Sequence, residues 1–287
     1  MDLVPRRDPD RHLVPDLVDD LGTPYRPQAP PRRIVSLVPS LTEAVAVTDA
    51  AVLVGATDYC THPAALDVAR VGGSRFPNLD AVQHVAPDLV LGNAEENQLA
   101  DLERLRAVGI PVWVTAPTTL AEAFGSLRRM LAACGLIRPA GGGHDGDAGD
   151  DGGQDGDPAW LDQARRAWSS TYDGSAPRRT AVVPIWRRPW RVLGSGTFGG
   201  DMLRRLGIGN AFGDAAERYP VVTVEQLRAC GADLVVLPDE PYAFTAADAT
   251  TDLAGMDVAV VSGRHLFWYG PSLVEARDVL ERQLSGG

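Results

Sequence analysis

Polar and aromatic residues gather in three short segments that follow predicted strands. They are 93–97 (NAEEN), 186–190 (WRRPW) and 239–242 (DEPY). Aromatic residues in loops have no strand face to pack on, so together they are typical of a cleft for a large, flat, partly apolar ligand with an amide-rich rim. The alternative is that these aromatics pack two lobes together, and Trp268, within WYGP, also fits a structural turn.

Two further groupings have the chemistry to hold an anion or a metal. Residues 195–200 (SGTFGG), which include Thr197, precede a predicted helix, and their backbone amides are suited to a phosphate; an ordinary glycine-rich turn is the alternative. Cys60 and His62 are two positions apart, but no second pair accompanies them. We therefore expect no metal site built from protein side chains.

The residues that most enzyme mechanisms need are missing. The chain contains no lysine, which excludes a P-loop lysine, a pyridoxal Schiff base and a lysine nucleophile. It has no G-x-S-x-G or H-E-x-x-H motif, and no G-x-G-x-x-G opens the first helix. We expect a non-enzymatic binding protein. The alternatives are a cytoplasmic enzyme or chelatase-like protein that handles a tetrapyrrole or metal cofactor on a two-lobe scaffold, and a protein-interaction module.

An internal repeat positions these segments. Residues 79–96 correspond to 224–241 at a fixed offset of 145 residues, and the same offset places 36–39 over 181–184. Each half alternates apolar, β-branched runs with stretches of helical period, which indicates parallel βα units. Ligands of open α/β sheets bind beyond the carboxyl ends of the strands, so two similar lobes predict a cleft between them.

The predicted fold class is α/β, with two Rossmann-like lobes joined by a single connector helix. The Gly- and Asp-rich insert after the first lobe cannot bury apolar surface, so we expect it to be disordered. The predicted boundaries are a flexible extension at 1–31, a first lobe at 32–135, the insert at 136–157, the connector helix at 158–176 and a second lobe at 177–287.

Composition excludes several partners. The net charge of −11 disfavours nucleic acid and anionic membranes, which need clustered basic residues. No apolar run approaches the length that spans a bilayer, and the N-terminus has no apolar segment typical of an export signal, so the expected compartment is the cytoplasm. An upstream start would instead allow a periplasmic or extracellular protein. Three cysteines without a C-x-x-C pair predict no disulfide framework, and we expect a monomer.

Six segments, taken in order, carry a family resemblance: RIVSLVPSLTEAV, GATDYCTHP, VGGSRFPNLD, APDLVLGNAEEN, GIPVWV and LFWYGPSLVEA. They resemble the cobalamin-binding branch of the Fe³⁺-siderophore and B12 receptors, also called helical-backbone metal receptors. The resemblance implies a class III periplasmic-binding-protein-like fold whose lobes move little. It also implies cobalamin or a related corrinoid as the ligand, with no covalently bound cofactor; haem and a ferric siderophore remain open.

The resemblance also bears on individual residues. Family members carry tryptophans where this chain has Ser74 and Asn93, whereas Tyr59 and Tyr219 match aromatic positions of the family. A phosphate at Thr197 would then be that of a corrinoid. The complete set of predicted ligand-binding residues is Tyr59, Ser74, Asn93, Glu96, Trp186, Arg188, Trp190, Thr197, Tyr219, Tyr242 and Trp268.

Two acidic residues occupy equivalent places in the repeat. Asp80 and Glu225 align at the offset of 145, each at the start of a short predicted helix. An acid in a first turn stabilises the helix dipole, which is one explanation for both. In the family that the chain resembles, an acid at these positions docks onto arginines of an ABC permease, so the resemblance implies such a partner.

Overall fold

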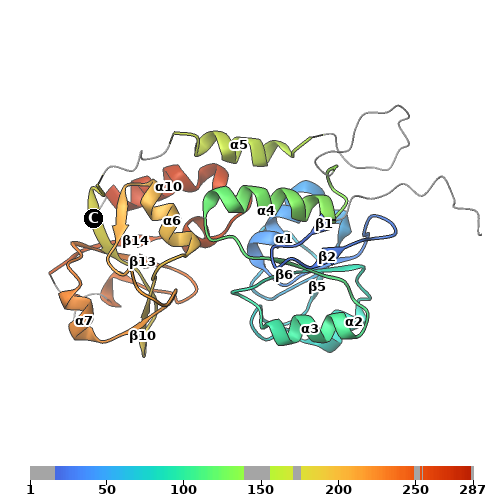
Figure 1. The fold of residues 1–287 in the computed structure, drawn as a ribbon, viewed down its shortest axis with the longest axis horizontal. Helices are drawn as coiled ribbons and strands as arrows, with labels where there is room; N and C mark the ends of the chain where they lie inside the picture. Colours follow the sequence, from blue (N-terminus) through green and yellow to red (C-terminus); the bar gives the residue numbers. More distant parts are fainter. Residues whose placement is uncertain (1–16, 139–155, 171–175, 249–252, 254, 286–287) are drawn as a thin grey trace, which may run out of the picture.

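The structure is a computed structural model that describes residues 17–138, 156–170, 176–248, 253 and 255–285. Two α/β lobes lie side by side (Figure 1). Nearly all of the predicted Gly/Asp insert, and residues 1–16 of the predicted extension, lie outside the described residues.

The first lobe contains a five-stranded parallel sheet in the order β5-β4-β3-β6-β7. The central strands β3 and β6 are completely buried, because helices cover both faces of the sheet. The strands are β3 (Ile34–Ser36), β4 (Leu53–Ala56), β5 (Ala69–Arg70), β6 (Leu89–Asn93) and β7 (Val112–Thr115); the helices are α1 (Pro39–Asp49), the 3₁₀ turn η1 (Ala50–Val52), α2 (Leu79–His84), α3 (Leu99–Ala107) and α4 (Leu120–Ala133).

The second lobe has a four-stranded parallel sheet, β11-β8-β13-β14, and a smaller antiparallel sheet, β12-β10-β9. The strands are β8 (Arg179–Val182), β9 (Pro184–Trp186), β10 (Trp190–Val192), β11 (Ile208–Asn210), β12 (Val221–Val222), β13 (Leu234–Pro238) and β14 (Asp257–Val261). The helices are α6 (Phe198–Arg205), α7 (Val224–Ala229), α9 (Gly263–Phe267) and α10 (Leu273–Ser285). The predicted α/β class with two parallel-sheet lobes is confirmed.

The repeat is visible in the elements themselves. Strand β13 begins 145 residues after β6 and has the same length, and α7 has the same relation to α2. Equivalent strands and helices therefore end at equivalent places. The loops that follow them occupy corresponding positions in the two lobes.

Helix α5 (Ala159–Ala167) lies within the predicted connector and is attached to both lobes. Its Trp160 Nε1 donates a hydrogen bond to Oγ1 of Thr48 in α1, at 3.0 Å. Trp168, the residue after the helix, donates from Nε1 to the carbonyl of Leu273 in α10, at 2.9 Å. The two tryptophans thus fix α5 across the junction by burying their rings and pairing their indole N–H groups.

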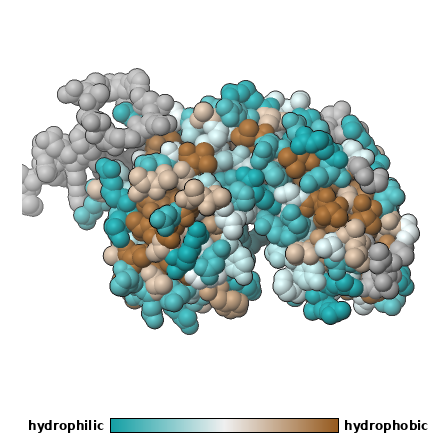
Figure 2. All heavy atoms as spheres, turned by 180° about the vertical axis from the view of Figure 1, so that it is seen from behind, coloured by the Kyte–Doolittle hydropathy of each residue, from teal (hydrophilic) through white to brown (hydrophobic). Residues whose placement is uncertain are grey.

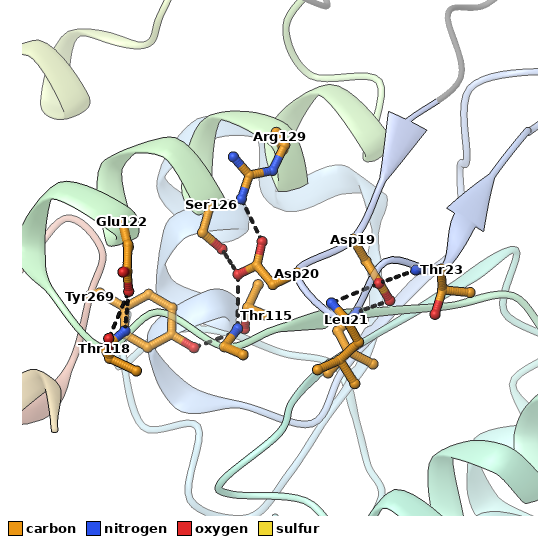
Figure 3. A network of polar contacts seen from close by, with 12 residues as sticks. Asp19, Asp20, Leu21, Thr23, Thr115, Thr118, Glu122, Ser126, Arg129 and Tyr269 are labelled. Atoms are coloured by element: carbon orange, nitrogen blue, oxygen red, sulfur yellow. Dashed lines mark hydrogen bonds and ion pairs between the residues drawn. The ribbon is translucent and has the colours of Figure 1, made fainter. Parts of the chain in front are cut away.

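The expectation of a flexible extension is wrong for residues 17–31. Strands β1 (Leu17–Val18) and β2 (Pro24–Tyr25) form a hairpin whose turn pairs with β7, the edge strand of the first sheet. Asp19 accepts from the amide of Val114, and Asp20 accepts from the amide of Ala116 at 2.8 Å. Asp20 also accepts from Ser126 and Arg129 of α4 (Figure 3). The hairpin therefore satisfies edge-strand amides that would otherwise lack partners.

Asp20→Asn should lower the free energy of unfolding by about 1 to 3 kcal/mol, because it disrupts three hydrogen bonds at a side chain that is 9% exposed. Urea denaturation measures the change. The control is Glu103→Gln, which removes an ion pair at a side chain that is 66% exposed and should cost about 1 kcal/mol or less. Equal losses in both variants would contradict the assigned role of Asp20.

Candidate ligand-binding cleft

The carboxyl ends of the two parallel sheets face each other across the junction. Asn93, the last residue of β6, donates from Nδ2 to Oη of Tyr269 at 2.6 Å. The hydroxyl of Thr115, at the end of β7, lies 2.8 Å from the same oxygen (Figure 3). Tyr269 follows α9 of the second lobe and is 4% exposed, and burial raises the pKa of its hydroxyl far above the usual value. These contacts join the lobes at one side of the cleft.

Two ion pairs also cross between the lobes. Glu43 in α1 pairs with Arg264 in α9, and Glu95 after β6 pairs with Arg218. The hydroxyl of Tyr219 donates to Glu95 as well, at 2.6 Å, and burial together with that carboxylate raises the pKa of the tyrosine above its usual range. Seen from behind, the surface has a notch between the lobes (Figure 2).

The spacing of Ser40 and Glu43 is that of a capping box, but the structure does not form one. Helix α1 begins at Pro39 with Val38 as its N-cap, so both residues lie inside the helix. Pro39 supplies the start instead, because its fixed φ suits a first helical position. The buried Glu43 is thereby free to pair with Arg264 of the other lobe.

Each lobe presents an aromatic side chain to solvent from a loop or strand end. Tyr59, after β4, is 66% exposed, and its ring approaches Gly73. Trp186, the last residue of β9, is 46% exposed and meets Tyr242 edge to face at 5.5 Å. Phe76 is 71% exposed and belongs to the same glycine-containing loop as Gly73; sequence reasoning missed it, although that loop was part of the family resemblance.

Two predicted ligand residues serve the fold instead. Trp190 is buried and stacks on Phe244 within the core of the second lobe, with ring centroids 6.1 Å apart. Trp186, on the paired strand β9, is linked to this core through Tyr242, whose ring lies 4.4 Å from that of Phe244. Asn93 is also buried, and its amide is used by Tyr269 and Thr115. Contact of either side chain with a ligand stays a prediction.

The other predicted residues differ in exposure. Ser74 is half-buried, its hydroxyl lies 3.3 Å from that of Thr57, and its carbonyl accepts from Asn97. Trp268 is 8% exposed and touches His62 edge to face at 5.5 Å, which makes it a contact between lobes. Arg188 is exposed at the β9–β10 turn with a positive φ of 65°.

Thr197 lines a pocket of about 540 Å³ at the start of α6. Lobe one contributes Thr118 and Thr119 to this pocket, and none of the predicted aromatic residues lines it. Within its wall, Asp201 is held by Arg204 and Arg205 and accepts from the amide of Leu120 at 2.9 Å. A carboxylate thus already occupies the first amide of α4, and phosphate binding near Thr197 stays a prediction.

Three carboxylates approach one another in the loops after β6 and β13. Burial, followed by the charges of Glu240 and Glu95, raises the pKa of Glu96 to about 8. Burial and the charge of Asp239 raise the pKa of Glu240 as well. Sequence reasoning selected Glu96 and the segment 239–242, but it chose Tyr242 rather than Glu240. The internal repeat held the signal, because Glu240 is the counterpart of Glu95.

The cysteine and histidine considered as ligands are separated by their surroundings. The thiol of Cys60 is buried and lies within 3.1 Å of the hydroxyls of Thr42 and Thr57, and burial raises its pKa. His62 turns toward Trp268. Among the described residues, no group of three or more His, Cys, Asp or Glu side chains is placed to hold a metal ion. Nor does that part of the chain contain a helix long and apolar enough to cross a membrane.

The fold and the cleft define a class III periplasmic-binding-protein-like molecule. No family model matches the chain. The vitamin B12-binding protein of Vibrio cholerae is 24% identical over 200 residues, which are 69% of this chain and 67% of that protein. This relative and the two solved structures described next confirm the resemblance to the B12 and Fe³⁺-siderophore receptor family.

Two solved structures illustrate the shared fold. The periplasmic vitamin B12-binding protein of Vibrio cholerae has a TM-score of 0.65 at 19% identity, covering 89% of this chain and 97% of that one. The periplasmic haem-binding protein of Roseiflexus sp. RS-1 has a TM-score of 0.68 at 19% identity, covering 88% and 98%. The fold is therefore common to proteins named for different metal-containing ligands.

Glu96→Gln should stabilise the protein near pH 9 and have little effect near pH 5. The folded protein holds the Glu96 proton up to about pH 8, whereas the ordinary pKa is 4.5. The protonated Glu96 side chain makes its full contribution to stability below the ordinary pKa. That contribution is lost as the pH rises through the pKa of the folded protein. We expect a gain of about 1 to 3 kcal/mol at the higher pH. Thermal melts at the two pH values measure it.

Glu122→Gln is the matched control of opposite sign. Hydrogen bonds from the amide and hydroxyl of Thr118 lower the pKa of Glu122, so its contribution to stability is present at neutral pH and lost as the pH falls below the ordinary value. At neutral pH the Glu122→Gln variant should be less stable than the native protein. The same pH trend in both variants would show that Glu96 does not titrate as described.

Proposed function

We propose that this protein is a non-enzymatic receptor that binds cobalamin or a related corrinoid or metal chelate in the inter-lobe cleft. The observation that carries the proposal is the pair of exposed aromatics, Tyr59 and Trp186, at the carboxyl ends of strands in facing lobes. A flat, partly apolar ligand is what such rings contact best. The vitamin B12-binding relative from Vibrio cholerae supports the choice of ligand.

We further propose that the protein acts as the substrate-binding component of an ABC importer, outside the cytoplasm. The two solved relatives described above are both named as periplasmic proteins. They favour the expectation of an exported protein and give no support to the expectation of a cytoplasmic one.

Trp186→Ala and Tyr59→Ala should each weaken binding of cyanocobalamin by about 1 to 3 kcal/mol, because each removes an exposed ring that the ligand would bury. Isothermal titration calorimetry measures the affinity. Trp186→Phe and Tyr59→Phe keep a ring and should lose much less. If cyanocobalamin fails to bind at concentrations approaching millimolar, the corrinoid proposal is wrong; binding of haem alone would assign the cleft to haem.

The exposure of Asp80 and Glu225 supports the proposed docking. Both are exposed, in the first turns of α2 and α7, which are capped by Asn78 and Thr223. The two helices lie on the side of the molecule opposite α5 and α10 (Figure 1). One acid per lobe on the same side of the molecule suits a partner with two basic sites. Their positions also suit stabilisation of the helix dipoles, so docking needs its own test.

Reversing both charges, with Asp80→Arg and Glu225→Arg, should abolish co-purification of the permease from native membranes. Affinity for cyanocobalamin should stay within about twofold, because exposed first-turn charges contribute only about 1 kcal/mol or less to the fold. Glu281→Arg, on α10, is the control and should leave co-purification intact. Equal co-purification by the double variant and the native protein would refute docking through these acids.

A further inference from the structure

Glu96 is a carboxyl group of the first lobe that reaches toward the second. Its backbone amide is fixed by Oδ1 of Asn93 at 3.1 Å, which orients the loop after β6. Its charge acts on Tyr219 and Tyr269 of the second lobe, and the charges of Glu240 in that lobe and of Glu95 in its own loop raise its pKa. Among the described residues its carboxyl group has no hydrogen-bond or ion-pair partner, although the residue is more than half buried.

Glu240 meets it from the other side. Trp268 lies close enough to the Glu240 side chain to lower its pKa, and Oε1 of Glu240 is buried without a partner among the described residues. The Glu240 residue also packs closely against the backbone of Gly263. A Cβ at Gly263 would lie 2.7 Å from the Glu240 carbonyl oxygen and would collide with its side chain, so only glycine leaves room there. The packing therefore holds a carboxyl oxygen in place that the protein itself does not use.

The arginines nearest to this pair are already engaged. Arg218 pairs with Glu95 and Arg264 pairs with Glu43, so each neutralises another carboxylate. The charge of Arg264 lowers the pKa of Glu240, but neither Glu96 nor Glu240 forms an ion pair among the described residues. At neutral pH the raised pKa of Glu96 leaves it mostly protonated, with one O–H donor and one carbonyl acceptor. Glu240 supplies a further acceptor.

We propose that Glu96 and Glu240 are specificity-determining residues of the cleft, which favour a ligand whose rim carries carboxamides over one whose rim carries carboxylates. This inference rests on the proposed function. A carboxamide offers an N–H to the free oxygen of Glu240 and exchanges two hydrogen bonds with the neutral Glu96 carboxyl group. A carboxylate in the same place brings a second negative charge beside Glu240, and the charges of Arg218 and Arg264 are already paired with Glu95 and Glu43.

The test compares two corrinoids that differ in this respect. Dicyanocobinamide carries carboxamides around its rim, and dicyanocobyrinic acid carries carboxylates. We expect the native protein to bind the first at least 30-fold more tightly, as measured by calorimetry at neutral pH. In the double variant Glu96→Gln, Glu240→Gln, the ratio of the two affinities should fall at least tenfold. Each single variant should lower it by a smaller factor, which gives a second measurement if the double variant folds poorly.

Glu103→Gln is the charge-matched control. It removes one negative charge on α3, where the carboxylate pairs only with Arg106, and should leave the ratio unchanged. An unchanged ratio in the Glu96 and Glu240 variants, with both corrinoids still bound, would overturn the specificity proposal and leave the proposed function standing. If neither corrinoid binds the native protein, the proposed function fails and this inference fails with it.

Discussion

The buried contact of Tyr269 with Asn93 and Thr115 determines how the two sheets face each other. Separating the lobes there would remove both of these partners from the buried Tyr269 hydroxyl, at a cost of about 1 to 3 kcal/mol, whereas Asn93 and Thr115 would keep partners in the first lobe. The ion pair of Glu43 with Arg264 adds a second restraint on the same side. Both inter-lobe contacts involve residues at or near strand ends. They therefore fix the distance between the two lobes without a ligand. A preformed cleft costs little ordering when a rigid, flat ligand binds.

Much of the fold was predictable because the chain repeats itself. Strands β6 and β13 are buried on both faces, so their apolar, β-branched runs stand out, and the helices that precede them repeat at the same offset. The hairpin at 17–25 was not predictable in this way. It adds only Leu17 and Tyr25 to the core, too few to show a period, and its aspartates bond to amides in and just after β7, about a hundred positions further along. Periodicity does not report contacts of this kind.

The candidate site was predictable as a set of loops but not as a set of side chains. Sequence reasoning placed the aromatics of 186–190 at strand ends, and the structure separates an exposed Trp186 from a buried Trp190. The difference depends on the hairpin turn between them and on Phe244, which stacks on the buried ring from a distant loop. Asn93 shows the same limit: its partner Tyr269 is 176 positions away. The sequence shows that Asn93 has a side-chain amide that can form hydrogen bonds. It does not show that this amide joins the two lobes.

Glu95 and Glu240 occupy equivalent positions in the repeat, yet their surroundings give them different roles. Glu95 accepts a hydrogen bond from Tyr219 and forms an ion pair with Arg218. Its carboxylate therefore connects the two lobes. Oε1 of Glu240 has no hydrogen-bond partner among the described residues, and burial together with the charge of Asp239 raises the Glu240 pKa although Trp268 and Arg264 oppose the shift. Duplicated βα units place similar residues at equivalent positions. The partners that each lobe supplies then determine whether such a residue forms contacts between the lobes or stays without a partner. In this cleft Oε1 of Glu240 stays without a partner among the described residues, and the charge of Glu240 acts on Glu96 of the first lobe.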